Sequence, residues 1–201
     1  MSQLERLTGA ILEAAFVEVE ASGRHVHLTK ADALALFGHG LTEDRPLSQP
    51  GQYVCRERVT LIGPQGRLEH VAVLGPERPA SQVEISRTDA RTLGVRAPVR
   101  LSGDTKGTPG IRLAGDRGEV ALSEGVLIAR RHIHMTPQAA ARYGVGEGDE
   151  VRVRCLSARP LVLEGVAVRV SGQFANRVHI DYDEANACGH QKGDLGVILR
   201  G

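Results

Sequence analysis

Apolar and polar residues alternate with a period of two through most of this chain, a pattern that predicts β-strands. Typical segments read HVHL, EHVAVLG, QVEIS, DEVRVRC and LVLEGVAVRV, and they are rich in β-branched residues. Turn signals such as Gly63-Pro64, Gly75-Pro76 and Gly115-Asp116 separate the segments. We predict a mainly β fold of barrels rather than open sheets, because closure removes the edges that many short strands would expose.

Helical periodicity occurs only in short segments of the chain. Residues 2–15 form one predicted helix, with Leu4, Leu7, Ile11 and Leu12 along one face. Two more follow the R-H-x-H strands directly. Thr29-Lys-Ala-Asp32 has the pattern of a capping box before residues 33–37, and Thr136-Pro137 supplies a cap and an N1 proline before residues 138–143. Residues 38–53 have no period and are predicted as an inserted loop.

The chain contains an internal duplication. The segment 24–29 (RHVHLT) reappears as 131–136 (RHIHMT), a shift of 107 residues. Residues 68–94 also align without gaps on 163–189, a shift of 95, with ten of the 27 positions identical. We interpret the chain as two copies of one unit, in which the first copy has 12 extra residues around the PLSQPGQ segment.

The duplication brings candidate metal ligands into equivalent places. Residues i and i+2 of a strand point to one face, so both histidines of each H-x-H pair can face one point. The second alignment places Glu84 on His179 and supplies a third ligand. The two sets are His25, His27 and Glu84, and His132, His134 and His179. A single H-x-H pair is weak support, but two copies in register favour zinc or another divalent transition metal.

Composition excludes several other classes of function. A formal charge of +1 on 201 residues, no Trp and 3% aromatic residues argue against nucleic-acid binding. The longest apolar runs are of the type VLIA at 126–129, so we expect no membrane span. No secretory signal is visible, and Cys55, Cys155 and Cys188 form no disulfide pattern, so a reducing compartment is expected. Cys188-Gly-His190 lacks an oxyanion motif and is interpreted as structural.

Six motifs in order, SGRHVHL, PLSQPGQ, VLGPER, QVEISRTDA, RHIHMTP and HIDYDEANA, closely resemble the zinc-dependent phosphate propanoyltransferases, the PduL-type phosphotransacylases. The resemblance extends from about residue 17 to 198. It implies two closely packed β-barrels with short helical caps. The first would comprise residues 24–129, and the second residues 130–201 together with strand 16–23. Gly23 departs from the family, which usually has a larger residue there.

The resemblance also implies a site. Two zinc ions per chain would lie in a cleft between the barrels, one held by His25 and His27 and open to the sulfur of coenzyme A. The second would be held by Glu84, His132, His134 and His179. Arg78, in the motif G-P-E-R, matches the family arginine that contacts phosphate, and Arg87 is the next candidate.

The expected reaction is reversible transfer of a propanoyl or acetyl group between coenzyme A and inorganic phosphate. We expect phosphate to attack acyl-CoA directly in a ternary complex, because no nucleophile elbow and no Ser-His-Asp order is visible. One rival is a di-zinc hydrolase of a thioester or ester, which would have no need of Arg78 when its substrate is neutral. Another is a non-catalytic barrel module whose metal is structural.

The remaining expectations concern partners and location. The partners are acyl-CoA and phosphate, without nucleic acid or membrane, and a homodimer is expected. The location is the cytoplasm, with the lumen of a bacterial microcompartment used in propanediol degradation as the alternative. In relatives destined for such compartments the targeting helix precedes the fold as an extension. Only 24 residues precede His25 here, so the predicted N-terminal helix is expected to cover a barrel end or a dimer contact.

Overall fold

The computed structural model describes residues 4–5, 7–9 and 15–199, which divide into two compact units. One unit contains the residues up to Ser22 and those from Arg131 onward, and the other contains Gly23–Arg130. Each unit has its own buried apolar core. The chain therefore crosses from one unit to the other just before each H-x-H strand.

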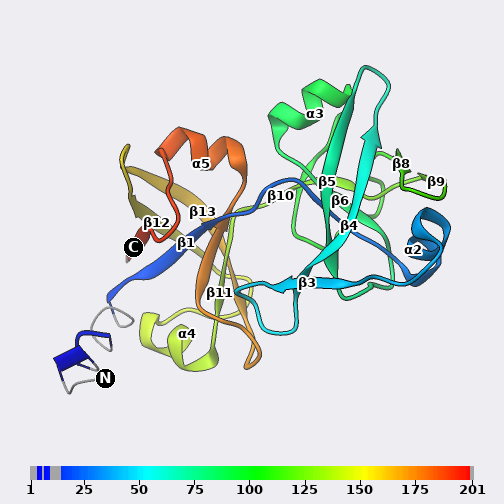
Figure 1. The fold of residues 1–201 in the computed structure, drawn as a ribbon. Coiled ribbons are helices and arrows are strands. Elements are labelled where there is room, and N and C mark those ends of the chain that lie inside the picture. The colour runs from blue at the N-terminus through cyan, green and yellow to red at the C-terminus, as the bar shows by residue number, and fades with distance from the viewer. Residues whose placement is uncertain (1–3, 6, 10–14, 200–201) are drawn as a thin grey trace. The chain divides into compact units, whose positions relative to one another are not determined.

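A closed six-stranded barrel forms the unit that holds the C-terminal part of the chain (Figure 1). Its elements are β1 (Val17–Ala21), β11 (His132–Met135), α4 (Pro137–Tyr143), β12 (Glu150–Leu156), β13 (Leu161–Val170), β14 (Arg177–Ile180), α5 (Tyr182–Cys188) and β15 (Leu195–Leu199). The strand order is β1-β14-β11-β13-β12-β15. In β12, Val151, Val153 and Cys155 are buried and the residues between them are exposed, as period-two alternation predicts.

Strand β1 comes from the N-terminal part of the chain but completes this barrel. It pairs in parallel with β14 and antiparallel with β15, so that the first strand lies beside the last ones, as Figure 1 shows. Val17 and Val19 bury their side chains in the core of the barrel. In the β1–β14 register, Glu20 lies opposite His179. The strand that precedes the first H-x-H pair thus belongs to the unit of the second pair.

The other unit is a curled sheet of nine strands. Its elements are β2 (His25–His27), α2 (Lys30–Phe37), β3 (Glu43–Pro46), β4 (Tyr53–Ile62), β5 (Arg67–Gly75), β6 (Gln82–Glu84), α3 (Arg87–Leu93), β7 (Val99–Arg100), β8 (Ile111–Ala114), β9 (Glu119–Leu122) and β10 (Val126–Ala129). The order is β7-β10-β6-β2-β5-β4-β8-β9, with β3 on β4. The prediction of a mainly β fold with a barrel is confirmed, but the hydrogen-bonded path of this second sheet is open between β7 and β9.

Part of the segment predicted as an inserted loop is a strand. All four residues of β3 are exposed, and the strand pairs antiparallel with β4. Its sequence, EDRP, has no apolar alternation because neither face is buried. Backbone hydrogen bonds alone define this strand, so a pattern based on side-chain burial does not detect it.

The helices begin at side-chain caps. Thr29 and Thr136 cap α2 and α4 as predicted. The expected capping box at Thr29 is only half formed, because the carboxylate of Asp32 accepts a hydrogen bond from Ser81. Complete capping boxes instead begin α3, which the apolar pattern did not single out, and α5; their N-caps are Ser86 and Asp181. Each of these two capping boxes begins two residues after the third candidate ligand of its unit, Glu84 or His179.

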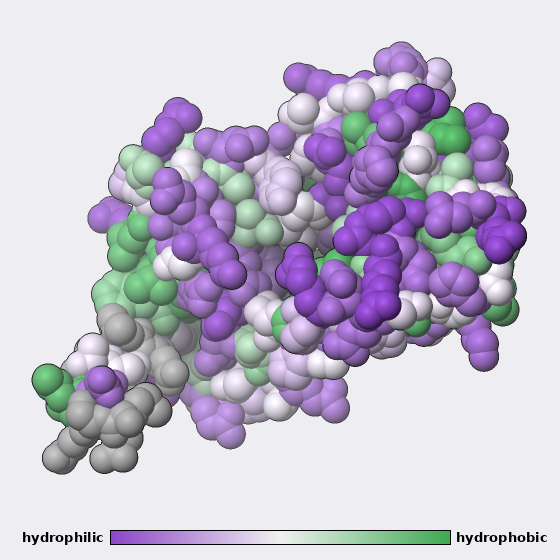
Figure 2. Space-filling model, viewed as in Figure 1, coloured by the Kyte–Doolittle hydropathy of each residue, from purple (hydrophilic) through white to green (hydrophobic). Residues whose placement is uncertain are grey.

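The predicted N-terminal helix is described only in part. Residues 4, 5, 7–9 and 15 are helical, while residues 2, 3, 6 and 10–14, with Ile11 and Leu12 of the apolar stripe, lie outside the described residues. Leu4 and Leu7 are exposed. Among the described residues, no helix is long and apolar enough to cross a membrane. Hydrophilic side chains predominate on the face shown in Figure 2.

The buried seam between β1 and the C-terminal strands predicts a specific loss of stability. Val19→Ala removes two methyl groups from a side chain that is 1% exposed, and should lower the free energy of unfolding by about 1–3 kcal/mol. Val99→Ala, at a side chain that is 48% exposed, is the matched control and should change it by less than about 0.5 kcal/mol. Urea unfolding measures both, and equal losses would contradict the role of β1 in the barrel core.

Candidate metal centres

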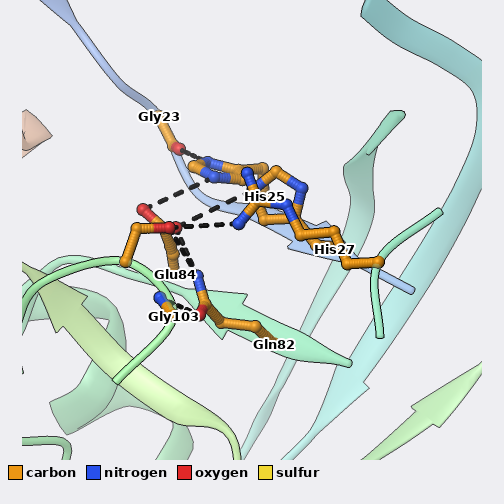
Figure 3. A network of polar contacts seen from close by, with 8 residues as sticks. Gly23, His25, His27, Gln82, Glu84 and Gly103 are labelled. Atoms are coloured by element: carbon orange, nitrogen blue, oxygen red, sulfur yellow. Dashed lines mark hydrogen bonds and ion pairs between the residues drawn. The ribbon is translucent and has the colours of Figure 1, made fainter. Parts of the chain in front are cut away.

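Strands β2 and β6 bring together the first ligand set. They run antiparallel in a register that places His25 opposite Glu84, and all three residues of β2 are buried. The Nε2 atom of His25 lies 3.5 Å from one carboxylate oxygen of Glu84, and the Nε2 atom of His27 lies 3.8 Å from the other. Figure 3 shows both rings directed towards this carboxylate. One ligand atom from each of the three residues lies within 4.8 Å of the others.

The second set has the same construction in the barrel. Strands β11 and β14 run antiparallel with His132 opposite His179, the register that His25 and Glu84 have in the other unit. The ring centroids of His132 and His134 are 4.7 Å apart, and both lie within about 5 Å of that of His179, at 5.1 and 5.0 Å. The three ligand atoms again lie within 4.8 Å of one another. The structure therefore brings together both triads that the repeat alignment predicted.

Electrostatics in the first triad favour a compact group of opposite charges. Burial lowers the pKa of His25, but the carboxylate of Glu84 outweighs this, so the pKa of His25 lies above its ordinary value. Burial also opposes ionisation of Glu84, yet His25 and His27 hold the pKa of its carboxyl well below the usual range. The Nδ1 atom of His25 is 2.8 Å from the carbonyl oxygen of Gly23, which favours a donor at Nδ1 and turns Nε2 towards Glu84.

In the second triad, His134 is kept neutral. Burial and the neighbouring His132 lower the pKa of His134 to about 3, so its ring is an uncharged imidazole at neutral pH. Its ring stacks on Phe174 with centroids 4.1 Å apart, and its Nδ1 atom is buried without a hydrogen-bond partner. An unpaired buried nitrogen costs about 1–3 kcal/mol. The donor atoms thus fit zinc, for which neutral imidazole and carboxylate are usual ligands.

Two residues beside Glu84 were not predicted from the sequence. The side-chain amide of Gln82 and the hydroxyl of Ser102 both donate to the same oxygen of Glu84, the hydroxyl at 2.7 Å. Gln82 also accepts from the backbone nitrogen of Gly103 at 2.7 Å, which ties the loop after β7 to β6 (Figure 3). Gln82 lies two residues before Glu84 on one strand face, a signal that the i, i+2 rule offered; Ser102 comes from a loop and gave none.

Arg78 lies next to this network. Its Nη1 atom donates to Ser102 Oγ at 3.1 Å, and its backbone nitrogen donates to the carbonyl oxygen of Leu28 at 2.8 Å. Burial, with the neighbouring His25 and Arg78, holds the pKa of His27 well below its ordinary value, and the positive charge of Arg78 opposes the rise in the pKa of His25 that Glu84 causes. The guanidinium predicted to contact phosphate is therefore linked to the first triad through one hydroxyl group.

The other residues considered in the sequence have separate surroundings. Arg87 is exposed at the start of α3. The thiol of Cys188 is buried and its sulfur lies 3.4 Å from the carbonyl oxygen of Ala185, while His190 lies 3.6 Å from Asp194. These contacts agree with a structural role for the Cys-Gly-His segment.

The position of Glu84 bears on one implied assignment. The resemblance assigns this carboxylate to the zinc of the second histidine set, whereas the structure places it within its own unit beside His25 and His27. The assignment of Glu84 to the second zinc stays a prediction.

Comparisons with known proteins show which family the chain belongs to. A family model described as phosphate propanoyltransferase matches residues 18–191. The chain is 55% identical to the phosphate propanoyltransferase of Enterococcus faecalis over 185 residues, covering 91% of this chain and 88% of that protein. It is 52% identical to that of Listeria monocytogenes over 201 residues, covering 99% and 94%. It is 52% identical to that of Thermotoga maritima over 184 residues, covering 90% and 88%.

The chain is therefore an acyltransferase by class. It belongs to the phosphate propanoyltransferase family.

The two triads predict the metal content of individual variants. Protein isolated without chelator should hold two zinc ions per chain. His179→Ala or His132→Ala should leave about one, because either change removes a ligand from the second triad, and His25→Ala should mainly deplete the first. Elemental analysis of the purified variants measures this. His70→Ala, outside both triads, is the control. Active wild-type protein without metal would contradict both assignments.

Proposed function

We propose that this chain uses two zinc ions to transfer a short acyl group, propanoyl or acetyl, reversibly between coenzyme A and inorganic phosphate. The observation that carries the proposal is the match of residues 18–191 to the phosphate propanoyltransferase family, with relatives about half identical over nearly their whole length. The two triads and the adjacent arginine support it, because thioester phosphorolysis needs stabilisation of a thiolate and an oxyanion together with an anchored phosphate.

The ligands of the two ions are proposed to be His25, His27, Glu84, His132, His134 and His179. When bound, zinc supplies Lewis-acid stabilisation of the sulfur and oxygen charges that develop during transfer. The side chain of Gln82 and the hydroxyl of Ser102 keep the Glu84 carboxylate in one orientation. Burial of the first triad excludes water, which would otherwise compete with phosphate for the acyl group.

Arg78 is proposed to hold phosphate by charge-assisted hydrogen bonds. A phosphate oxygen then attacks the carbonyl carbon, the carbon–sulfur bond breaks and coenzyme A leaves as the thiolate. Acyl phosphate is the other product, so no acyl-enzyme is formed. Ser102 supports Arg78 through the hydrogen bond to its Nη1 atom.

The rival interpretation of a di-zinc hydrolase has no observation in its favour. The relatives are named as transferases to phosphate, and a cationic side chain lies beside the first triad, where a hydrolase of neutral substrates has no use for it. The structural-metal alternative is likewise not favoured, because both triads supply three ligands rather than the four that enclose a structural zinc.

We further propose a homodimer in a reducing compartment, the cytoplasm or the lumen of a microcompartment. The three cysteines support the reducing compartment, since all are free and buried. Burial raises the pKa of both Cys55 and Cys155 to about 12, which keeps these thiols protonated and unreactive.

The assay that tests the function measures free thiol released from propanoyl-CoA. Release should require phosphate and stop when a chelator removes the metal, because both the acceptor and the ions are needed for transfer. Zinc added back in excess of the chelator should restore it. Thiol release at the same rate without phosphate would identify a hydrolase, and full activity of metal-free protein would contradict the role of zinc.

Arg78 gives a test of the phosphate site. Arg78→Ala should leave zinc content and coenzyme A binding nearly unchanged, since neither uses the guanidinium, and should lower phosphate-dependent turnover by roughly 10²-fold. Arg78→Lys should restore it only partly, because lysine lacks the planar fork. Arg112→Ala, at an exposed arginine of β8, is the control. Wild-type phosphate kinetics in Arg78→Ala would exclude this arginine and direct the same test to Arg87.

A further inference from the structure

The arginine before each H-x-H pair makes an ion pair that the metal site and the reaction do not by themselves require. In the sheet unit, Arg24 directly precedes His25 and binds Asp89 of α3 with two nitrogens. Its Nε atom lies 3.1 Å from one carboxylate oxygen and its Nη2 atom 2.8 Å from the other. The carboxylate is almost fully buried, while the arginine side chain is 40% exposed. This bidentate geometry fixes both partners more strictly than a single contact.

The same pair recurs in the barrel. Arg131 directly precedes His132, and its Nη1 atom donates to Glu184 of α5 at 2.7 Å. Arg24 and Arg131 are separated by the 107-residue shift, and Asp89 and Glu184 by the 95-residue shift of the second alignment. The two ion pairs are therefore equivalent under the duplication, although the acidic residue differs.

Each acidic partner also belongs to a capping box. Asp89 accepts from the backbone nitrogen of Ser86 at 3.2 Å, and Glu184 accepts from that of Asp181 at 3.1 Å. Each N-cap lies two residues after the third ligand of its unit, Glu84 or His179. One carboxylate thus links the chain just before the first ligand with the chain just after the third.

Each ion pair connects the segments that flank the two strands whose register brings the three ligands of its triad together. His25 lies opposite Glu84 and His132 opposite His179, at strands of only three or four residues. Few ladder hydrogen bonds hold such short strands, and the chain changes units directly before each of them. A slip of one residue would turn a ligand to the other face.

We propose that Arg24 and Arg131 are positioning residues, each of which clamps its H-x-H strand to the helix after the third ligand and so keeps three metal ligands in register. The proposal rests on the two metal centres of the proposed function. It predicts a local effect of each arginine, confined to the triad of its own unit.

The test is a titration of metal-stripped full-length protein with Co²⁺, whose visible spectrum reports coordination. Wild-type protein should bind two equivalents. Arg24→Gln should weaken one site by roughly 10- to 100-fold, the range for residues that orient ligands, and change its spectrum while the other site stays as in the wild type. Arg131→Gln should weaken Co²⁺ binding at the other site, the barrel triad, and leave the site of the sheet unit as in the wild type. Arg67→Gln, which removes an exposed pair with Glu69, is the control and should change neither.

Three conservative variants separate positioning from folding. Asp89→Asn keeps an oxygen for the cap but removes the charge, so it should reproduce the loss in Arg24→Gln, and the double variant should be no weaker than either single one. Arg131→Lys should recover more affinity than Arg24→Lys, because the Arg24 pair uses two nitrogens. If Arg24→Gln does not fold, Asp89→Asn and Arg24→Lys provide the same comparison.

The outcomes distinguish the two proposals. Two Co²⁺ equivalents bound equally well by the wild type and by the Arg24 and Arg131 variants would overturn the positioning role and leave the metal centres intact. Equal weakening of both sites by one variant would also overturn it. Wild-type protein that binds no Co²⁺ and no zinc would overturn the metal centres themselves.

Discussion

The antiparallel register of two short strand pairs is the constraint on which the candidate site depends. In each unit the first histidine of the H-x-H pair faces the third ligand across the ladder, His25 opposite Glu84 and His132 opposite His179. Directly opposite residues of an antiparallel pair have neighbouring side chains, so one correct register brings three donors together. The cores, caps and flanking ion pairs around these strands all act to keep that register.

Duplication explains why two such sites exist. The strand that pairs beside the third ligand comes from the other half of the repeat, and its residues make the surroundings of the two sites differ. Strand β1 pairs with β14, and its repeat counterpart β10 pairs with β6 in the same parallel sense. Glu20 lies opposite His179, and Leu127, the residue 107 positions later, lies opposite Glu84. A carboxylate oxygen therefore lies 3.9 Å from His179 Nδ1 in one unit, where the other unit has a leucine.

The two triads differ in the charges of their buried donor groups. In the sheet unit a carboxylate compensates the buried imidazoles, and the polar side chains of Gln82 and Ser102 fill the remaining hydrogen-bonding positions on it. In the barrel no carboxylate belongs to the triad, and burial together with the neighbouring His132 lowers the pKa of His134 to about 3, so its ring stays neutral. The same backbone geometry thus provides two donor sets of different charge, which is consistent with different tasks for two ions.

The sequence by itself determined most of the strands, the duplication and the grouping of both ligand triads, because period-two burial, turn residues and the Glu84–His179 alignment are local or repeated signals. It did not show the exposed strand β3, which backbone pairing alone defines, or the hydroxyl of Ser102 beside Glu84, which arrives from a loop. Only the tertiary structure decided the order in which the strands pair around the barrel and that Arg24 meets Asp89, 65 residues away. Such contacts depend on which segments pack together, and side-chain periodicity contains no record of that choice.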